Sequence, residues 1–416
     1  MTHLVLAGVL ALSPGLRARI DAIVVQVMHA QHVAGLSLGI ARNGSRLYLR
    51  GYGWRDATTG QPADGFTIYR AGSIAKQFAA AMAMQQVAAG RVALDAPANS
   101  YVATPIDGSH EVTIAQLLGQ TSGITALSGA SPVGLAFDPG TGWAYSNANY
   151  DLLGMALHAV TGAAYPTLLR DGITGPFSLF STGCAPSPFA QNIARGYLWA
   201  AGWKQAPPFP GGNTDVDCAS TGLLSNAADL IHWLEDLRSG RVVSQTSFAM
   251  MTATGRLANG VATHYGFGFF VANWFGYTVA EHPGYADGFS GDDALVLQSG
   301  LEIAVLSNAE AVDLTPLVRS IVAILDEPLD PNLSASANQP PQNENLRITA
   351  ALKAALQTSR YASYGTLESA EFVERSVVGP TTYDKYRLTF SGGQWWATIG
   401  YGAGEAIESL SLMPVE

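Results

Sequence analysis

Apolar residues recur every three to four positions in several parts of the chain, which is the period of a helix. This spacing predicts helices over 16–31 and over 221–239, the second with a capping residue at Ser225 or Asn226. The stretch FAAAMAMQQVAAG, residues 78–90, is apolar almost all round and ends in glycine. It therefore predicts a buried helix with a glycine cap.

Two other regions alternate between apolar and polar residues, as strands do. The segment GLSLGIARNGSRLYLRGYG alternates on both sides of Asn43-Gly44, which is a strong signal for a β-hairpin. Residues 265–309 contain further strand-like runs separated by Gly-rich turns. A hairpin, a block of helices and then more strands predict a mixed α/β domain. Its sheet would contain both the N-terminal hairpin and the later strands.

The C-terminal part of the chain has a different pattern. Residues 328–345 are rich in Pro, Asn and Ser and weakly hydrophobic, which is typical of a linker. A predicted helix over 346–357 and several strand-like runs follow. We therefore expect a main domain over 16–327 and a small α+β domain over 346–416. Residues 1–15 include an apolar run too short to span a bilayer, and we interpret them as a signal remnant or a disordered N-terminus.

The composition narrows the class of protein. The 416 residues are 48% hydrophobic and 13% charged, so the chain can bury a large core and is not intrinsically disordered. A formal net charge of −10 does not favour binding to nucleic acid or to an anionic membrane. Cys184 and Cys218 are either unrelated buried thiols or one disulfide formed in an oxidising compartment, and no metal site is suggested. A periplasmic or secreted location is the expectation, with the cytoplasm as the alternative.

The stretch AGSIAKQF places Ser73 and Lys76 three residues apart. On a helix such residues share a face, so the hydroxyl and the amine can touch. A lysine in this apolar helix is costly to bury unless it is paired or loses its proton, and it could then take a proton from the hydroxyl. The backbone N–H of Ser73, in the first turn, could stabilise an oxyanion. The alternative is a surface serine and lysine that share a helix by chance.

Two further triplets carry candidate chemistry. YSN (145–147) lies between a Pro-Gly turn and a helix expected from about 149 to 160, which Gly162 closes. HPG (282–284) lies among the predicted C-terminal strands of the main domain. Taken singly, the first is compatible with an ordinary half-buried aromatic residue and the second with an ordinary histidine in a turn.

Taken together, S-x-x-K at 73–76 and Y-x-N at 145–147 resemble the motifs of the serine β-lactamase and penicillin-binding-protein superfamily. More narrowly, the chain resembles the branch with class C β-lactamases, D-aminopeptidases, DD-carboxypeptidases and family VIII-type carboxylesterases. The resemblance extends over about 16–325 and includes the segments VTIAQLLGQTSGI and GLLSNAADLIHWLEDLRSG. It implies an α+β fold in which an antiparallel sheet is flanked by helices, with an inserted all-helical lobe and an active site between the two.

The resemblance also implies roles for the site residues. Lys76 and Tyr145 would accept the proton of Ser73, which attacks a substrate carbonyl and forms an acyl-enzyme. The N–H groups of Ser73 and Tyr285 would hold the oxyanion. No metal or organic cofactor is needed for this chemistry. The residues that would contact substrate are Asn147, His282, Gly284 and Tyr285.

Two positions depart from the family pattern. His282 stands where many β-lactamases and DD-peptidases have lysine, and a mostly neutral histidine is a weaker anchor for a substrate carboxylate. Gln120 stands where relatives often have histidine, and the sequence suggests no reason for it. Whether Asn147 would bind the substrate amide or Lys76 stays open.

We therefore expect a serine hydrolase that acts on the amide or ester bonds of small molecules, either D-amino-acid peptides and amides or carboxylic esters. The alternatives are a β-lactamase and a non-hydrolysing penicillin-binding or sensor module. We expect no nucleic-acid partner and no transmembrane anchor. The sequence leaves the oligomeric state open.

Overall fold

The predicted N-terminal segment (1–15) lies mostly outside the residues that can be described, and the predicted linker (328–345) lies outside them entirely. The domain boundaries proposed from the sequence therefore stay predictions. A computed structural model describes residues 12–102, 111–128, 131–132, 134–185, 191–200, 202–207, 217–326, 346–357, 364–378, 381–391, 393–401 and 407–415.

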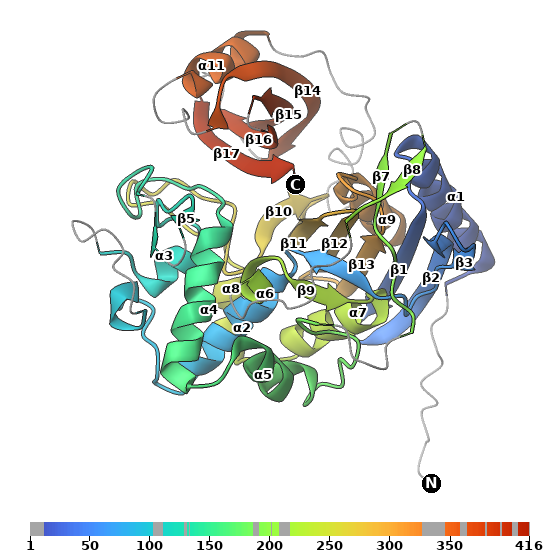
Figure 1. Cartoon of the computed structure of the whole chain (residues 1–416), viewed down its shortest axis with the longest axis horizontal. Coiled ribbons are helices and arrows are strands. Elements are labelled where there is room, and N and C mark those ends of the chain that lie inside the picture. Colours follow the sequence, from blue (N-terminus) through green and yellow to red (C-terminus); the bar gives the residue numbers. More distant parts are fainter. Residues whose placement is uncertain are drawn as a thin grey trace.

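The main sheet is antiparallel and joins the two ends of the predicted main domain (Figure 1). β1 pairs with β13, with Leu36 opposite Ser307. The predicted hairpin is confirmed, because β1 and β2 turn at Asn43-Gly44, whose φ angles are 49° and 74°. In the described chain the strand order of the main sheet is β10-β11-β12-β13-β1-β2-β3. The strands are β1 (Gly35–Arg42), β2 (Ser45–Asp56), β3 (Gln61–Pro62), β10 (Phe270–Trp274), β11 (Tyr277–Ala286), β12 (Phe289–Val296) and β13 (Leu301–Ser307).

Helices cover both faces of this sheet, as expected. Successive residues of β13 divide between two cores, because a strand has a two-residue period. Ile303 and Val305 lie in the core beneath α1 (Pro14–Ala30) and α9 (Thr315–Leu325). Ala304 and Leu306 lie in the other core, with α7 (Ala227–Arg238).

A lobe built mainly of helices shares the second core with this face of the sheet (Figure 1). α2 is buried along nearly its whole length and ends two residues before Gly90, in agreement with the predicted buried helix. The described helices of the lobe are α2 (Ala75–Ala88), η1 (Ala98–Ser100), α3 (Ile114–Leu118), α4 (Asn147–Thr161), α5 (Tyr165–Leu169), the π-helical turn η2 (Arg170–Thr174), α6 (Asp217–Ser220) and α8 (Gln245–Met251). Short strands pair as β4 (Tyr69–Gly72) with β9 (Leu223–Ser225), β5 (Leu127–Ser128) with β6 (Ser131–Pro132), and β7 (Tyr197–Trp199) with β8 (Trp203–Gln205).

Several predicted helices start at other residues than expected, with α1 beginning at Pro14 and α2 at Ala75. The helix predicted over 221–239 begins only at Ala227, because the preceding residues pair with β4 as strand β9. Asn226 is its cap, since its side chain accepts a hydrogen bond from Asp229 N. α4 begins two residues earlier than predicted, and the closing glycine is confirmed by its left-handed φ of 72°.

The C-terminal residues form a small α+β unit, as expected. Its strands make one antiparallel sheet in the order β14-β15-β16-β17, which packs with α11 around a separate core (Figure 1). The elements are α11 (Leu346–Leu356), β14 (Leu367–Val378), β15 (Thr381–Phe390), β16 (Gly393–Tyr401) and β17 (Ile407–Val415).

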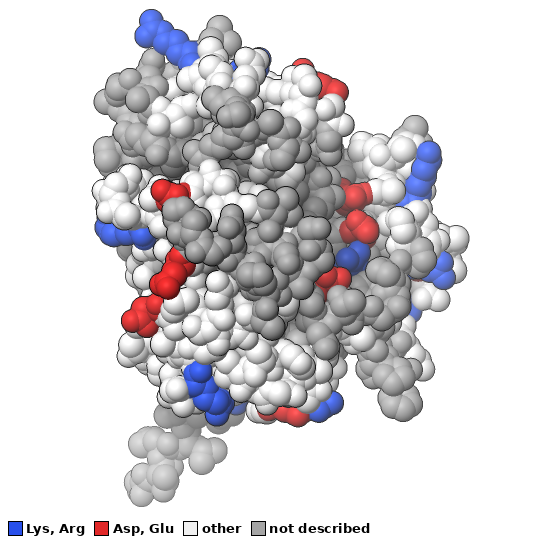
Figure 2. Space-filling view, turned by 60° about the vertical axis from the view of Figure 1, so that its left-hand side comes forward, with Lys and Arg blue, Asp and Glu red and all other residues white. Residues whose placement is uncertain are grey.

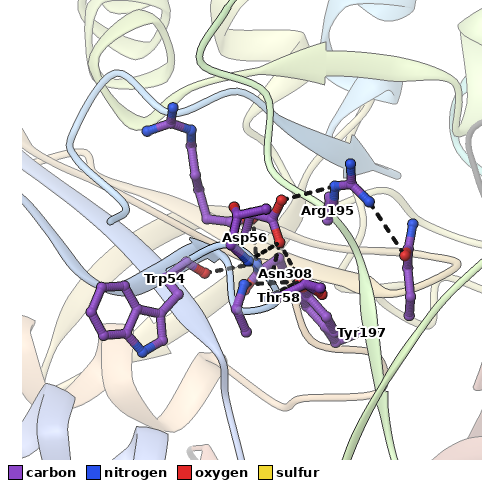
Figure 3. Close-up of polar contacts among 10 residues, drawn as sticks. Trp54, Asp56, Thr58, Arg195, Tyr197 and Asn308 are labelled. Carbon is purple, nitrogen blue, oxygen red and sulfur yellow. Dashed lines mark hydrogen bonds and ion pairs between the residues drawn. The ribbon is translucent and has the colours of Figure 1, made fainter. Parts of the chain in front are cut away.

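Polar contacts anchor the segment around β7 to the main sheet (Figure 3). Asp56, at the end of β2, accepts a hydrogen bond from Tyr197 Oη at 3.1 Å and lies 3.0 Å from Arg195 Nε. Tyr197 N in turn donates to the carbonyl of Gly288, at 3.2 Å. The segment is therefore held beside the turn that follows β11.

Taken singly, the described helices differ from membrane spans in length or composition. None of them is by itself long and apolar enough to cross a bilayer. One bent pair, 147–161 with 165–174, reaches the required length and composition.

Candidate active site

Ser73 and Lys76 meet where β4 leads into α2. Ser73 directly follows β4, and Gly72 before it has a left-handed φ of 57°. Lys76 lies in the first turn of α2 and is fully buried, whereas Ser73 is partly exposed. Lys76 Nζ is 3.0 Å from Ser73 Oγ, so the predicted contact between amine and hydroxyl is present.

Lys76 also donates hydrogen bonds to residues of other elements. Its Nζ donates to Asn147 Oδ1 at 2.7 Å and to the carbonyl oxygen of Ser220 at 2.8 Å. Asn147 is the first residue of α4, and Ser220 is the last of α6. The amine is therefore held from three sides and aimed at Ser73. The sequence left open whether Asn147 binds the substrate amide or Lys76, and the structure shows the contact with Lys76. The contact with Ser220 was not predicted, because any residue type can offer a backbone carbonyl.

Tyr145 lies beside this pair. The centre of its ring is 4.7 Å from Lys76 Nζ. The ring runs nearly parallel to that of Phe270, with the centroids 6.1 Å apart, and its centroid is 5.8 Å from that of His282. The structure thus brings the SxxK, YxN and HPG motifs together.

His282 is buried, and both ring nitrogens are engaged by the protein. Nδ1 is 2.7 Å from the carbonyl oxygen of Pro283, which can only accept, so Nδ1 carries the proton. Nε2 is then the acceptor for the hydroxyl of Tyr265, 3.2 Å away. Burial, together with the positive charge of Lys76, lowers the pKa of His282 from 6.5 to about 3. This geometry suits a neutral histidine that holds the strand in place better than one that contacts substrate. The predicted binding role of His282 stays a prediction.

Gly284 and Tyr285 bring β11 against the residues that precede Ser73. A Cβ atom on Gly284 would overlap the carbonyl oxygen of Ala71, and one on Gly72 would crowd the backbone of Tyr285. Glycine at both places allows the two backbones to touch. The backbone of Tyr285 is thereby placed next to the start of α2, where an oxyanion donor is expected.

The cysteines form a disulfide that supports the site. Cys184 and Cys218 are bonded, with their Cα atoms 5.5 Å apart, which decides between the two alternatives that the sequence allowed. Cys218 lies in α6, two residues before Ser220. The disulfide therefore ties down the short helix whose carbonyl accepts a hydrogen bond from Lys76.

Removing this disulfide is expected to lower both stability and turnover. The bond spans 34 residues, and closing a loop of that length stabilises a fold by about 4 kcal/mol in the chain-entropy model. Thermal unfolding of a C184S/C218S double variant should show a clearly lower Tm, and kcat should fall because α6 is less restrained. A reducing agent should shift the wild type towards the variant and leave the variant unchanged. Equal Tm values for the two proteins would contradict this role.

The stability of the protein is expected to fall in acid because of His282. The unfolded chain protonates this residue near pH 6.5, whereas the folded protein keeps it neutral to about pH 3. Stability is therefore fully present above pH 6.5 and lost as the pH falls through this window, by at most about 1.4 kcal/mol per pH unit. Urea unfolding between pH 7 and pH 5 should show a shallower loss for His282→Asn than for the wild type. Replacing the exposed His29 by asparagine is the control, and an equal slope in all three proteins would count against the prediction.

The chain is similar to several known proteins. The Beta-lactamase family matches residues 20–322. Protein flp from Staphylococcus aureus (strain MRSA252) is 26% identical over 341 residues, 73% of this chain, but this chain spans only 65% of that relative's length. Esterase EstB from Burkholderia gladioli is 33% identical over 202 residues, which cover 40% of this chain and 51% of the esterase. An octameric penicillin-binding protein homologue from Pyrococcus abyssi has a similar fold, with a TM-score of 0.67 and 21% identity over 92% of this chain and 96% of that one. The chain thus belongs to the Beta-lactamase family, whose members include serine hydrolases, and it has the helix-flanked antiparallel sheet of that family.

Proposed function

We propose that this protein is a serine hydrolase that forms an acyl-enzyme on Ser73 and hydrolyses amide or ester bonds of small substrates. The observation that carries the proposal is the distance of 3.0 Å between Lys76 Nζ and Ser73 Oγ at the start of α2. A buried amine in contact with a partly exposed hydroxyl is the arrangement of an activated nucleophile.

In the acylation step, Ser73 Oγ attacks the substrate carbonyl carbon, and its proton passes to the Lys76–Tyr145 pair. The negative charge that develops on the carbonyl oxygen is held by the N–H groups of Ser73 and Tyr285. The bond to the leaving group then breaks, and Tyr145 returns a proton to the departing alcohol or amine. The close approach of β4 and β11 supports this placement of the two donors.

In the second step, water attacks the acyl group on Ser73. Tyr145 takes a proton from that water, the bond to Ser73 breaks, and Ser73 regains its proton as the acid leaves. The hydrogen bonds from Lys76 to Asn147 and to the carbonyl of Ser220 support this step, because they keep the amine in place while charge moves.

The surroundings of Ser73 favour substrates that carry no carboxylate. His282 is neutral and bonded within the protein, so it does not offer a cation to a substrate carboxylate. The half-buried rings of Trp143, Tyr145 and Phe270 lie together beside it. Carboxylic esters and D-amino-acid amides fit this environment, and the similarity to an esterase supports the ester class. The alternatives are a β-lactamase and a non-hydrolysing penicillin-binding or sensor module.

The partner is proposed to be a small molecule. On the face drawn in Figure 2, the described acidic and basic side chains are interspersed, and they do not form the single-sign surface expected for nucleic acid. A periplasmic or secreted location is also proposed, and the disulfide supports it because such bonds persist in oxidising compartments.

The test is a time course with three chromogenic substrates, followed by intact-mass analysis. We would use p-nitrophenyl acetate, a D-alanyl p-nitroanilide and nitrocefin. Steady turnover of the ester or the anilide, with a transient adduct on Ser73, supports the proposal, whereas turnover of nitrocefin alone supports the β-lactamase alternative. A stoichiometric burst with a lasting adduct supports the sensor alternative. No turnover and no adduct with any of the three would contradict the proposal.

A further inference from the structure

We propose that Gln120 is a positioning residue that holds the segment 145–147 against Lys76. This inference rests on the proposed function, because it concerns how Tyr145 and Asn147 are kept in place for acyl transfer. Gln120 is fully buried. It therefore acts through its neighbours and does not contact substrate.

Gln120 forms hydrogen bonds on both sides of Tyr145. Its backbone carbonyl accepts a hydrogen bond from Ala144 N, and its side-chain Oε1 accepts one from Ser146 N, both at 3.0 Å. The residues directly before and directly after Tyr145 are thus bonded to the same glutamine. The ring between them packs against Phe270 and Lys76. Tyr145 is therefore fixed by its backbone on one side and by ring packing on the other.

The same side chain sets the start of α4. Gln120 Oε1 also accepts a hydrogen bond from Asn149 Nδ2 at 2.5 Å. Ser146 is the N-cap residue of α4, but its side chain makes no capping bond and donates to the carbonyl of Thr125 at 3.1 Å. Gln120 thus restrains the first turn of α4 from outside the helix. Asn147 stands in that turn and accepts the hydrogen bond from Lys76 Nζ.

The backbone of Gln120 is held in an unfavourable conformation. Its φ of 62° lies in the left-handed region, which is unfavourable for a residue with a side chain. In this conformation both its carbonyl and its side chain reach the same short segment. Such strain is kept only where the surrounding structure imposes it. Here Gln120 is bonded to the segment that contains Tyr145 and Asn147, and both of these residues contact Lys76.

Three variants of Gln120 test this inference. Gln120→Leu keeps the size of the side chain but removes the acceptor, and kcat for the turned-over substrate should fall by roughly 10- to 100-fold with KM changed little. Gln120→Glu keeps an acceptor oxygen at the same distance and should recover most of this loss. If the leucine variant does not fold, Gln120→Asn takes its place, because its shorter side chain withdraws the oxygen from Ser146 N.

The matched control is Ser122→Ala. Ser122 Oγ donates to Asn149 Oδ1 at 2.5 Å in the same buried network, but it makes neither of the bonds that flank Tyr145. Its loss should lower Tm by an amount similar to that of the Gln120 variants and leave kcat within about threefold of the wild type. Wild-type kcat in Gln120→Leu, or in Gln120→Asn where the leucine variant does not fold, would overturn the inference. An equal loss of kcat in Ser122→Ala would also overturn it. Neither result would affect the proposed function, which is tested separately by turnover and adduct formation in the wild type.

Discussion

Replacing Ser73 by alanine is expected to abolish turnover, with kcat reduced by roughly 10⁴-fold or more. The variant lacks the oxygen that would form the acyl bond, so intact-mass analysis should find no adduct at any time after mixing. The fold should persist, because Ser73 is only partly buried and Lys76 keeps its bonds to Asn147 and Ser220. The measurement is the initial rate with the turned-over substrate, together with Tm and circular dichroism.

The control for this result is Ser45→Ala, which removes an exposed serine from the hairpin between β1 and β2. It should keep wild-type kcat and KM. Wild-type activity in Ser73→Ala would remove Ser73 as the nucleophile and leave the family assignment standing without a mechanism. A lasting adduct on another residue of that variant would point to a different nucleophile.

Replacing Lys76 by methionine is expected to reduce kcat by roughly 10³-fold. Methionine keeps most of the length and volume of lysine, but it cannot exchange a proton with Ser73 Oγ. The acylation rate should therefore fall, and a single-turnover experiment should show the adduct on Ser73 forming slowly, if it forms at all. Asn147 Oδ1 and the carbonyl of Ser220 both lose their bond to Nζ, so a small drop in Tm is also expected.

Lys76→Arg separates charge from proton transfer. The guanidinium keeps the positive charge but does not lose its proton in proteins, so this variant should be nearly as inactive as the methionine variant. Substantial activity in Lys76→Arg would mean that the lysine serves mainly as a charge beside Tyr145. Kinetics close to wild type in Lys76→Met would contradict any role of the amine.

Local signals in the sequence predicted much of this architecture. The hairpin at Asn43-Gly44 follows from two residues that tolerate positive φ between two alternating runs. Ser73 lies in the turn just before α2 and Lys76 in the first turn of α2, and Lys76 N donates a hydrogen bond to the carbonyl of Ser73. Their spacing of three residues alone therefore brings the two side chains within reach. The start of α7 was less predictable, since strand or helix at 223–225 is decided by the presence of β4 as a pairing partner.

Contacts between distant segments were beyond the reach of the sequence. Lys76 and the carbonyl of Ser220 are 144 residues apart, and nothing in the residue types marks that pairing. The engagement of His282 by Tyr265, and of Ser146 by Gln120, likewise depends on how strands and helices pack. Gln120 could be singled out in the sequence as a departure from the family pattern, but its partners could not be identified.

The sequence by itself determined the family, the antiparallel sheet flanked by helices and the pairing of Ser73 with Lys76, because these depend on periodicity, on short motifs and on spacing within one turn. Only the tertiary structure decided that Cys184 and Cys218 are bonded, that His282 is held neutral inside the protein, and that Gln120 flanks Tyr145. Each of these depends on burial and on contacts between segments that are distant along the chain. Such contacts arise only when the whole core packs, since no local preference of the chain specifies them.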